Sequence, residues 1–160
     1  MQPFPFEVSF YKVQFHELND IDKELVMQAR QATLSAYAPY SNFQVGCAIL
    51  LEDSTILQGF NVENAAYSSC ICAERNAITT SMSMYHDKKI LKIAIAHTVD
   101  HQPANKWISP CGECRQVLME AVVRQGSDME MYLYGTDDNI LYIPHVTQLL
   151  PLGFEPKDLK

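Results

Sequence analysis

The sequence predicts an α/β fold in which helices cover a central β-sheet. Apolar residues recur at helical spacing in some segments and follow strand-like patterns in others, and the two kinds of segment alternate along the chain. A length of 160 residues also suffices to bury the core of one domain. Alternating helices and strands are typical of layered proteins with a sheet between helices.

The first helix is expected to follow an N-terminal arm. Residues 1–15 alternate loosely between apolar and polar types and contain two prolines, which favours an extended arm or an edge strand. From Asn19 or Asp20, either of which can cap a helix, apolar residues recur at helical spacing until Pro39. The sequence therefore predicts a single domain over residues 1–160, in which residues 1–15 are an arm of unknown role.

The remaining elements are predicted from apolar runs and from the turn-forming residues between them. A β-hairpin comes first, and Gly126 can end the last long helix. In order, the sequence predicts strands at 43–51 and 55–62, a helix at 72–84, a strand at 90–97, a loop at 99–110, a helix at 111–124, a strand at 129–134, a turn at 135–139, and a short strand followed by a short helix at 146–150.

Charge and composition disfavour several classes of protein. Nineteen acidic residues against twelve Lys and Arg give a net charge of −7, which disfavours nucleic acid or an anionic membrane as a partner. No window approaches the roughly 20 apolar residues that a membrane span needs. The five cysteines are an odd number, and the N-terminus lacks a basic-then-apolar leader, so we expect reduced thiols in the cytoplasm.

Three of the cysteines have the spacing of metal ligands. Cys72 opens the second expected helix, and Cys111 and Cys114 stand three residues apart at the start of the third. Residues three apart share a helix face, and the free N–H groups at a helix start lower thiol pKa values. Thiolates favour Zn²⁺ over Mg²⁺ or Ca²⁺, and three protein ligands on a tetrahedral ion leave one position for water. We therefore expect one zinc ion per chain.

Charged residues beside these cysteines are candidates for supporting roles. Glu74, two residues after Cys72, could act as general base and acid next to the water without binding metal. Three thiolates leave net negative charge on the site, so cationic donors around it would help. We expect Arg75, Arg115 or both to donate a hydrogen bond to a cysteine sulfur.

Other cysteines and the histidines are expected to have no part in the site. Cys47 and Cys70 lie among apolar or small residues, where a free cysteine packs as a small hydrophobe, although Cys70 could compete with Cys72 as a ligand. The five histidines share no spacing and are expected to be surface or core residues. A zinc site that only braces the fold is the alternative to a catalytic one.

Taken together, the motifs resemble those of the cytidine deaminase family of zinc nucleoside deaminases, in the form with three cysteine ligands. The resemblance covers about residues 18–159. The motifs that carry it are Tyr40-Ser41-Asn42-Phe43-Gln44-Val45-Gly46, Asn61-Val62-Glu63-Asn64-Ala65, Cys72-Ala73-Glu74-Arg75, Ser109-Pro110-Cys111-Gly112-Glu113-Cys114-Arg115-Gln116, and Leu149-Leu150-Pro151 followed by Phe154.

The resemblance implies a fold, a three-layer α-β-α sandwich with a mixed central sheet. It also implies an activity, the hydrolytic deamination of a nucleoside. Cys72, Cys111 and Cys114 would bind zinc, and Glu74 would shuttle protons while water replaces the amino group at C4 of cytidine or 2'-deoxycytidine. Uridine or 2'-deoxyuridine and ammonia would be the products. Such an enzyme would serve pyrimidine salvage.

The resemblance also implies which residues bind the nucleoside. Asn61 and Glu63 match residues that hydrogen-bond the ribose hydroxyls, and Val62 lies between them. Phe43 matches an aromatic residue that packs on the base, and Ala73 belongs to the substrate-binding set. Taken without the resemblance, Phe43 could be strand core, and Asn61 with Glu63 could be a solvated loop.

Assembly is implied by the resemblance alone. Tyr67 and Phe154 match residues that complete a neighbouring subunit's pocket, which implies a homotetramer with shared active sites. Ordinary packing is the alternative role for both side chains.

Three rival functions stay open. A polynucleotide cytosine deaminase is disfavoured, because such enzymes usually have His in place of Cys72 and a basic groove. A deaminase of a nucleoside-like antibiotic such as blasticidin S shares the zinc motifs, although Glu63 favours a free ribose hydroxyl. The third rival is a non-catalytic, zinc-braced binding protein, in which Glu74 would be dispensable.

Overall fold

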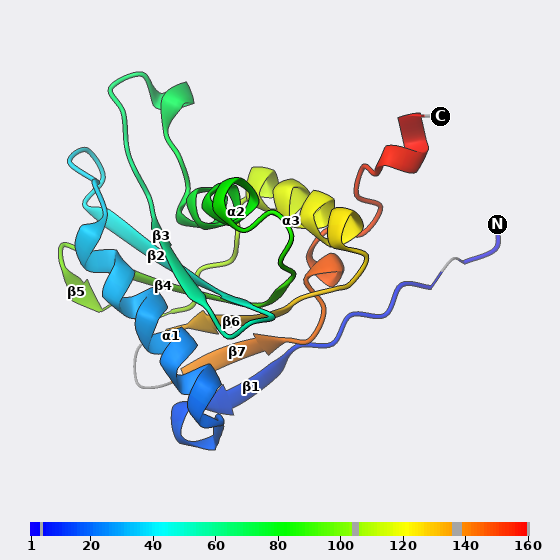
Figure 1. Ribbon diagram of the computed structural model, residues 1–160, viewed down its shortest axis with the longest axis horizontal. Coiled ribbons are helices and arrows are strands. Elements are labelled where there is room, and N and C mark those ends of the chain that lie inside the picture. The colour runs from blue at the N-terminus through cyan, green and yellow to red at the C-terminus, as the bar shows by residue number, and fades with distance from the viewer. Residues whose placement is uncertain (4, 104–105, 136–138, 160) are drawn as a thin grey trace.

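One mixed β-sheet forms the centre of the protein (Figure 1). The structure is a computed structural model and describes residues 1–3, 5–103, 106–135 and 139–159. Six strands lie in the order β1-β7-β6-β4-β2-β3, and β5 pairs with β4. Their bounds are β1 Tyr11–Gln14, β2 Phe43–Leu51, β3 Ile56–Phe60, β4 Ile90–Val99, β5 Gln102–Pro103, β6 Glu130–Tyr134 and β7 Asn139–Ile143. Strands β4 and β6 run parallel, whereas every other pairing is antiparallel.

Three long helices cover the two faces of the sheet. Helix α1 (Asp20–Ala32) packs on one face, and α2 (Ala73–Met84) and α3 (Gly112–Gln125) lie side by side over the other (Figure 1). The predicted three-layer α-β-α sandwich with a mixed sheet is confirmed. None of the helices in the described ranges is both long and apolar enough to cross a lipid bilayer.

Alternation along β2 divides its side chains between two cores. Cys47 and Ile49 face α2 and α3, whereas Ala48 and Leu50 face α1. Gly46 permits the close approach of α1, since a Cβ there would lie 2.1 Å from the carbonyl oxygen of Ala29.

Most predicted elements agree with the structure, and the first helix differs at its end. Asn19 is its N-cap, as expected, and its side chain accepts a hydrogen bond from the Asp22 N–H. The helix ends at Ala32 and a 3₁₀ turn over Thr33–Ser35 follows, so the expectation that it continues to Pro39 is wrong. The Thr33 hydroxyl donates to the carbonyl of Arg30, which competes with a further helical turn.

Two loop predictions fall partly outside the described residues. The predicted loop 99–110 contains the two-residue strand β5, and residues 104–105 lie outside the described ranges. The centre of the predicted turn 135–139, residues 136–138, also lies outside them.

The N-terminal arm ends in an edge strand. Strand β1 pairs with β7 at one edge of the sheet, and the residues before it run as extended chain towards the C-terminal segment (Figure 1). The Ser9 N–H donates to Gln148 Oε1 at 3.2 Å. The edge-strand alternative for this region is therefore confirmed for residues 11–14.

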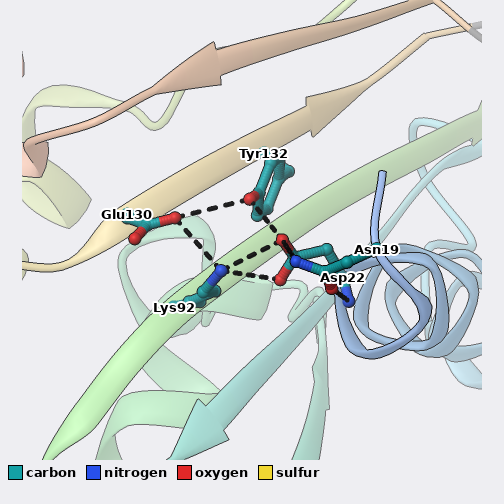
Figure 2. Close-up of polar contacts among 5 residues, drawn as sticks. All are labelled: Asn19, Asp22, Lys92, Glu130 and Tyr132. Atoms are coloured by element: carbon teal, nitrogen blue, oxygen red, sulfur yellow. Dashed lines mark hydrogen bonds and ion pairs between the residues drawn. The ribbon is translucent and has the colours of Figure 1, made fainter. Parts of the chain in front are cut away.

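A buried polar cluster ties α1 to the sheet on the face opposite α2 and α3. Lys92 Nζ lies 2.8 Å from Asp22 Oδ1 and 3.2 Å from Glu130 Oε2, and the Tyr132 hydroxyl donates to Asp22 Oδ2 at 2.8 Å (Figure 2). The Asn19 amide also donates to Asp22 at 2.9 Å. Asp22 is only 3% exposed, so its charge is compensated by partners rather than by water.

Candidate active site

The N-termini of α2 and α3 meet at the candidate site. Cys72 and Cys111 are the N-cap residues of these two helices, with extended backbone conformations, and Cys114 lies in the first turn of α3. Because the free N–H groups of a helix start favour negative charge, both helix starts can stabilise thiolates.

The three sulfurs have the spacing that a tetrahedral zinc ion requires. Cys111 Sγ lies 3.9 Å from Cys72 Sγ and 3.5 Å from Cys114 Sγ. Zn–S bonds of about 2.3 Å place two ligand sulfurs about 3.8 Å apart, so the donor set fits zinc. Among the described residues, this group of possible metal ligands contains these three cysteines and no fourth side chain.

The thiols differ in how readily they ionise. A hydrogen bond from Cys114 lowers the pKa of the Cys72 thiol to about 7, with a smaller contribution from the positive charge of Arg75. The same interaction raises the pKa of Cys114, which is fully buried. One thiolate therefore forms readily, and a divalent cation is the partner that would stabilise the others.

Glu74 follows in the first turn of α2 and is almost fully buried. Its side chain is 5% exposed, and burial raises the pKa of its carboxyl group. A raised pKa brings a carboxyl group closer to the neutral range, which favours a role as general acid and base.

Arg75 holds the loop in front of α2. Its Nη2 donates to the carbonyl of Cys70 at 3.0 Å, and its Nη1 lies 2.6 Å from Glu113 Oε2 in α3. The guanidinium therefore connects the two helix starts that carry the cysteines.

Arg115 anchors the segments on either side of α3. Its guanidinium donates to the carbonyl of Pro110 at 2.9 Å, to that of Leu149 at 3.1 Å, and to Ser109 Oγ at 2.9 Å. Within the described part of the chain, neither this guanidinium nor that of Arg75 donates to a cysteine sulfur, so that prediction is wrong. Their donors are instead directed at loop carbonyls, at the Glu113 carboxylate and at Ser109 Oγ.

A cavity of about 310 Å³ opens beside the sulfurs and Glu74, a volume within the range of small-molecule sites. Its wall includes eight residues that the sequence predicts for the site, and Cys114 is not among the wall residues. The predicted wall residues are Phe43, Asn61, Val62, Glu63, Cys72, Ala73, Glu74 and Cys111.

Asn61 and Glu63 are already engaged with neighbouring backbone. Asn61 accepts a hydrogen bond from the Val45 N–H at 2.7 Å and donates to the Phe43 carbonyl at 2.9 Å. Glu63 accepts from the Ser41 hydroxyl and from the backbone N–H groups of residues 40 and 41, and these bonds lower the pKa of its carboxyl group. Glu63 thus presents a carboxylate to the cavity, whereas Asn61 also holds strand β2 in place.

Tyr67 and Phe154 do not reach this cavity within one chain. The segment between β3 and α2 projects from the body of the protein (Figure 1). Tyr67 lies on this segment, is 75% exposed and packs edge-on against Tyr40. Phe154 is 56% exposed, and its carbonyl accepts a hydrogen bond from Gln116 in α3.

Sequence analysis missed part of the cavity wall. Val45 lies two residues after Phe43, so strand alternation could have assigned it to the same side. Ile71 and Ser109 lie close to the cysteines in sequence, but their loop positions gave no pattern to use. The missed residues are Val45, Cys70, Ile71, Ile108 and Ser109. Cys70 was expected to be a packing residue, and its sulfur accepts a hydrogen bond from the Asn64 N–H.

Comparison with known families identifies the group to which these features belong. Residues 19–127 match the family model of the cytidine and deoxycytidylate deaminase zinc-binding region. The chain belongs to the cytidine deaminase family. Membership confirms the resemblance and, together with the cysteine cluster, the prediction of a zinc-dependent hydrolytic deaminase.

Individual members of the cytidine deaminase family match over most of their length. The cytidine deaminase of Halalkalibacterium halodurans is 38% identical over 135 residues, which are 84% of this chain and 95% of that protein. The cytidine deaminase of Sporosarcina psychrophila is 39% identical over 140 residues, 88% of this chain and 95% of that one. The crystal structure of the Burkholderia pseudomallei cytidine deaminase has a TM-score of 0.68 at 35% identity, and the match covers 82% of this chain and 97% of that structure.

Proposed function

We propose that this protein deaminates cytidine and 2'-deoxycytidine hydrolytically, releasing uridine or 2'-deoxyuridine and ammonia. The observation that carries the proposal is the juxtaposition of Glu74 and two of the clustered cysteines in the wall of one cavity. A binding protein braced by zinc would have no need for a buried carboxyl group beside its metal ligands.

Cys72, Cys111 and Cys114 would hold one zinc ion per chain. When bound in such a site, zinc supplies the Lewis acidity that activates water in this class of deaminase. Arg75 and Arg115 support the ligands indirectly, because their hydrogen bonds fix the loops and helix starts from which the sulfurs project.

Glu74 would move the protons of the reaction. It would take a proton from the attacking water and deliver it to N3 of the pyrimidine, and it would then take the proton of the new C4 hydroxyl and pass it to the departing amino group. Burial supports this role, because it raises the pKa of the carboxyl group and keeps bulk water from competing for its protons.

Other residues of the cavity wall would bind the nucleoside. Phe43 would pack on the base, while Asn61 and Glu63 would accept or donate hydrogen bonds at the ribose hydroxyls, with Val62 and Ala73 as neighbouring wall residues. A site that pairs polar groups with hydroxyls rejects analogues that lack them, because its own groups would then stay unpaired.

The assembly would be a homotetramer with shared active sites. The exposure of Tyr67 and Phe154 supports this, since both are apolar side chains that a neighbouring subunit could cover. Mass measured in solution tests it: a tetramer is expected, and a monomer with full activity would contradict the shared site.

The cellular setting would be pyrimidine salvage in the cytoplasm. Five free cysteines, three of them needed as thiolates, support a reducing compartment. We further propose that residues 1–160 form one domain and that the arm, residues 1–15, belongs to it.

A uridine-formation assay on purified, metal-analysed protein tests the function. Cytidine and 2'-deoxycytidine are expected to be deaminated, and blasticidin S and cytosine in single-stranded DNA are the matched alternative substrates. Turnover of blasticidin S or DNA with none of cytidine would assign one of the rival enzyme functions. A zinc-loaded protein that deaminates none of the four would instead indicate a binding protein.

A further inference from the structure

His97 lies behind the base-binding side of the cavity, on the same face of the sheet. It follows Ile95 by two residues on β4, so its side chain faces α2 and α3. It stands opposite Val45 and diagonal to Phe43 on β2. The rings of His97 and Phe43 have centroids 5.2 Å apart and are inclined by 36°.

The imidazole is buried without full use of its hydrogen-bonding groups. His97 is 8% exposed, and its Nδ1 has no hydrogen-bond partner in the described part of the chain. Burial lowers the pKa of His97, so the ring is neutral at neutral pH. A buried polar atom without a partner destabilises a fold, and such exceptions concentrate at functional sites.

The backbone and the ring of Phe43 are held from different directions. The Asn61 amide donates to the Phe43 carbonyl and accepts from the Val45 N–H, which fixes the strand. The ring projects from that strand and lines the cavity. The tilted ring of His97 therefore lies against the Phe43 ring independently of the hydrogen bonds that fix the strand.

We propose that His97 is a positioning residue that holds the Phe43 ring as the wall against which the base packs. The shape of the imidazole performs this role, and its nitrogens do not. The proposal rests on the proposed function, because it needs a base to pack against Phe43.

Two variants of similar size separate ring shape from polarity. His97→Phe keeps a flat ring, whereas His97→Leu fills the space without one. We expect KM for cytidine to rise about tenfold in the leucine variant with kcat changed less than about twofold, in line with the loss of one aromatic pair. The phenylalanine variant should retain the wild-type KM and melt at a higher temperature, because the unpaired Nδ1 is gone.

Ile93→Val, on the same face of β4 and further from Phe43, is the control for a purely structural loss.

A binding measurement separates this proposal from the function on which it rests. The Kd of cytidine, measured by calorimetry in a Glu74→Gln background, should follow the same pattern as KM. An unchanged KM and Kd in the leucine variant, or a phenylalanine variant as impaired as the leucine one, would overturn the positioning role. An inactive wild-type enzyme would overturn the proposed function, and the Kd values would still decide the role of His97. If the leucine variant does not fold, His97→Met makes the same comparison.

Discussion

Two clusters of ionisable side chains lie on opposite faces of one sheet, and they are built in opposite ways. Under α1, the carboxylate of Asp22 is paired with the Lys92 ammonium and with the Tyr132 hydroxyl (Figure 2). Under α2 and α3, Glu74 lies near three thiols. The first cluster pairs its buried carboxylate with a cation, whereas the second gathers groups that all become negative on ionisation.

The contrast separates a structural cluster from a functional one. The ion pair of Asp22 with Lys92 holds α1 to the sheet, and the buried carboxylate has its cation within the protein. Several thiols beside a buried carboxyl group cannot all ionise without a cation, because their negative charges would repel one another. This arrangement therefore indicates a bound metal ion. Changes in the two clusters should therefore affect different properties of the protein.

The largest expected effect is on catalysis, from Glu74→Gln. The amide cannot shuttle protons, so we expect kcat to fall by roughly 10²- to 10⁴-fold while zinc content and melting temperature are retained. Glu120→Gln is the control, since Glu120 is an exposed carboxylate further along α3. Equal losses in both variants would mean that Glu74 has no special role.

The next effect is on stability, from Lys92→Met. Removing one partner of a buried ion pair should lower the free energy of unfolding by about 3 kcal/mol, because Asp22 keeps its charge without its main cation. Turnover per folded molecule should not change. The control is Lys88→Met, which breaks an ion pair of 3.9 Å near the surface and should lower the free energy of unfolding far less. Urea unfolding checks both values, and equal losses would remove the distinction between the clusters.

A smaller effect concerns alkaline pH. Burial and the hydrogen bond with Asp22 raise the pKa of Tyr132. Burial alone would lower the pKa of Lys92, but the pairing of Lys92 with Asp22 outweighs this, and the pKa of Lys92 is raised overall. Groups with raised folded-state pKa values stabilise the protein below their unfolded pKa, and this stability is lost as the pH rises. The urea midpoint should therefore fall between about pH 9.5 and 11, and Tyr132→Phe should flatten this decline. An equally steep decline in that variant would contradict the assignment.

The smallest effect is expected from the arm, which belongs to neither cluster. Deleting residues 1–9 removes the hydrogen bond of Ser9 with Gln148 and the half-exposed Phe6, which lines a surface hollow together with residues of the C-terminal segment. We expect the melting temperature to fall by a few degrees, about 4 °C for each kcal/mol lost, while zinc content stays at one per chain. Unchanged melting and assembly would show that the arm does not pack on the protein.

Local pattern was enough to predict one cluster and not the other. Cys111 and Cys114 are three residues apart, and Cys72 and Glu74 are two apart, so their spacing at helix starts pointed to shared chemistry. Asp22 meets Lys92 across 70 positions of sequence and Tyr132 across 110. No periodicity encodes such a pairing, because it depends on how α1 crosses the sheet.

Contacts between residues far apart in sequence also explain where the sequence-based predictions differ from the structure. The order of helices and strands could be predicted because apolar periodicity is local. The hydrogen bonds of Arg115 could not, since they depend on where the carbonyl of Leu149 lies after the chain has folded. The contact between His97 and Phe43 likewise needs the register of β4 against β2.

The central claim is that the thiol cluster becomes catalytic when it binds one zinc ion. The most direct measurement is a titration of zinc into metal-free protein, with uridine formation from cytidine followed at each step. We predict that activity rises in proportion to zinc and reaches a plateau at one equivalent per chain. Uridine formation at full rate without metal, or none at saturating zinc in folded protein, would contradict the account.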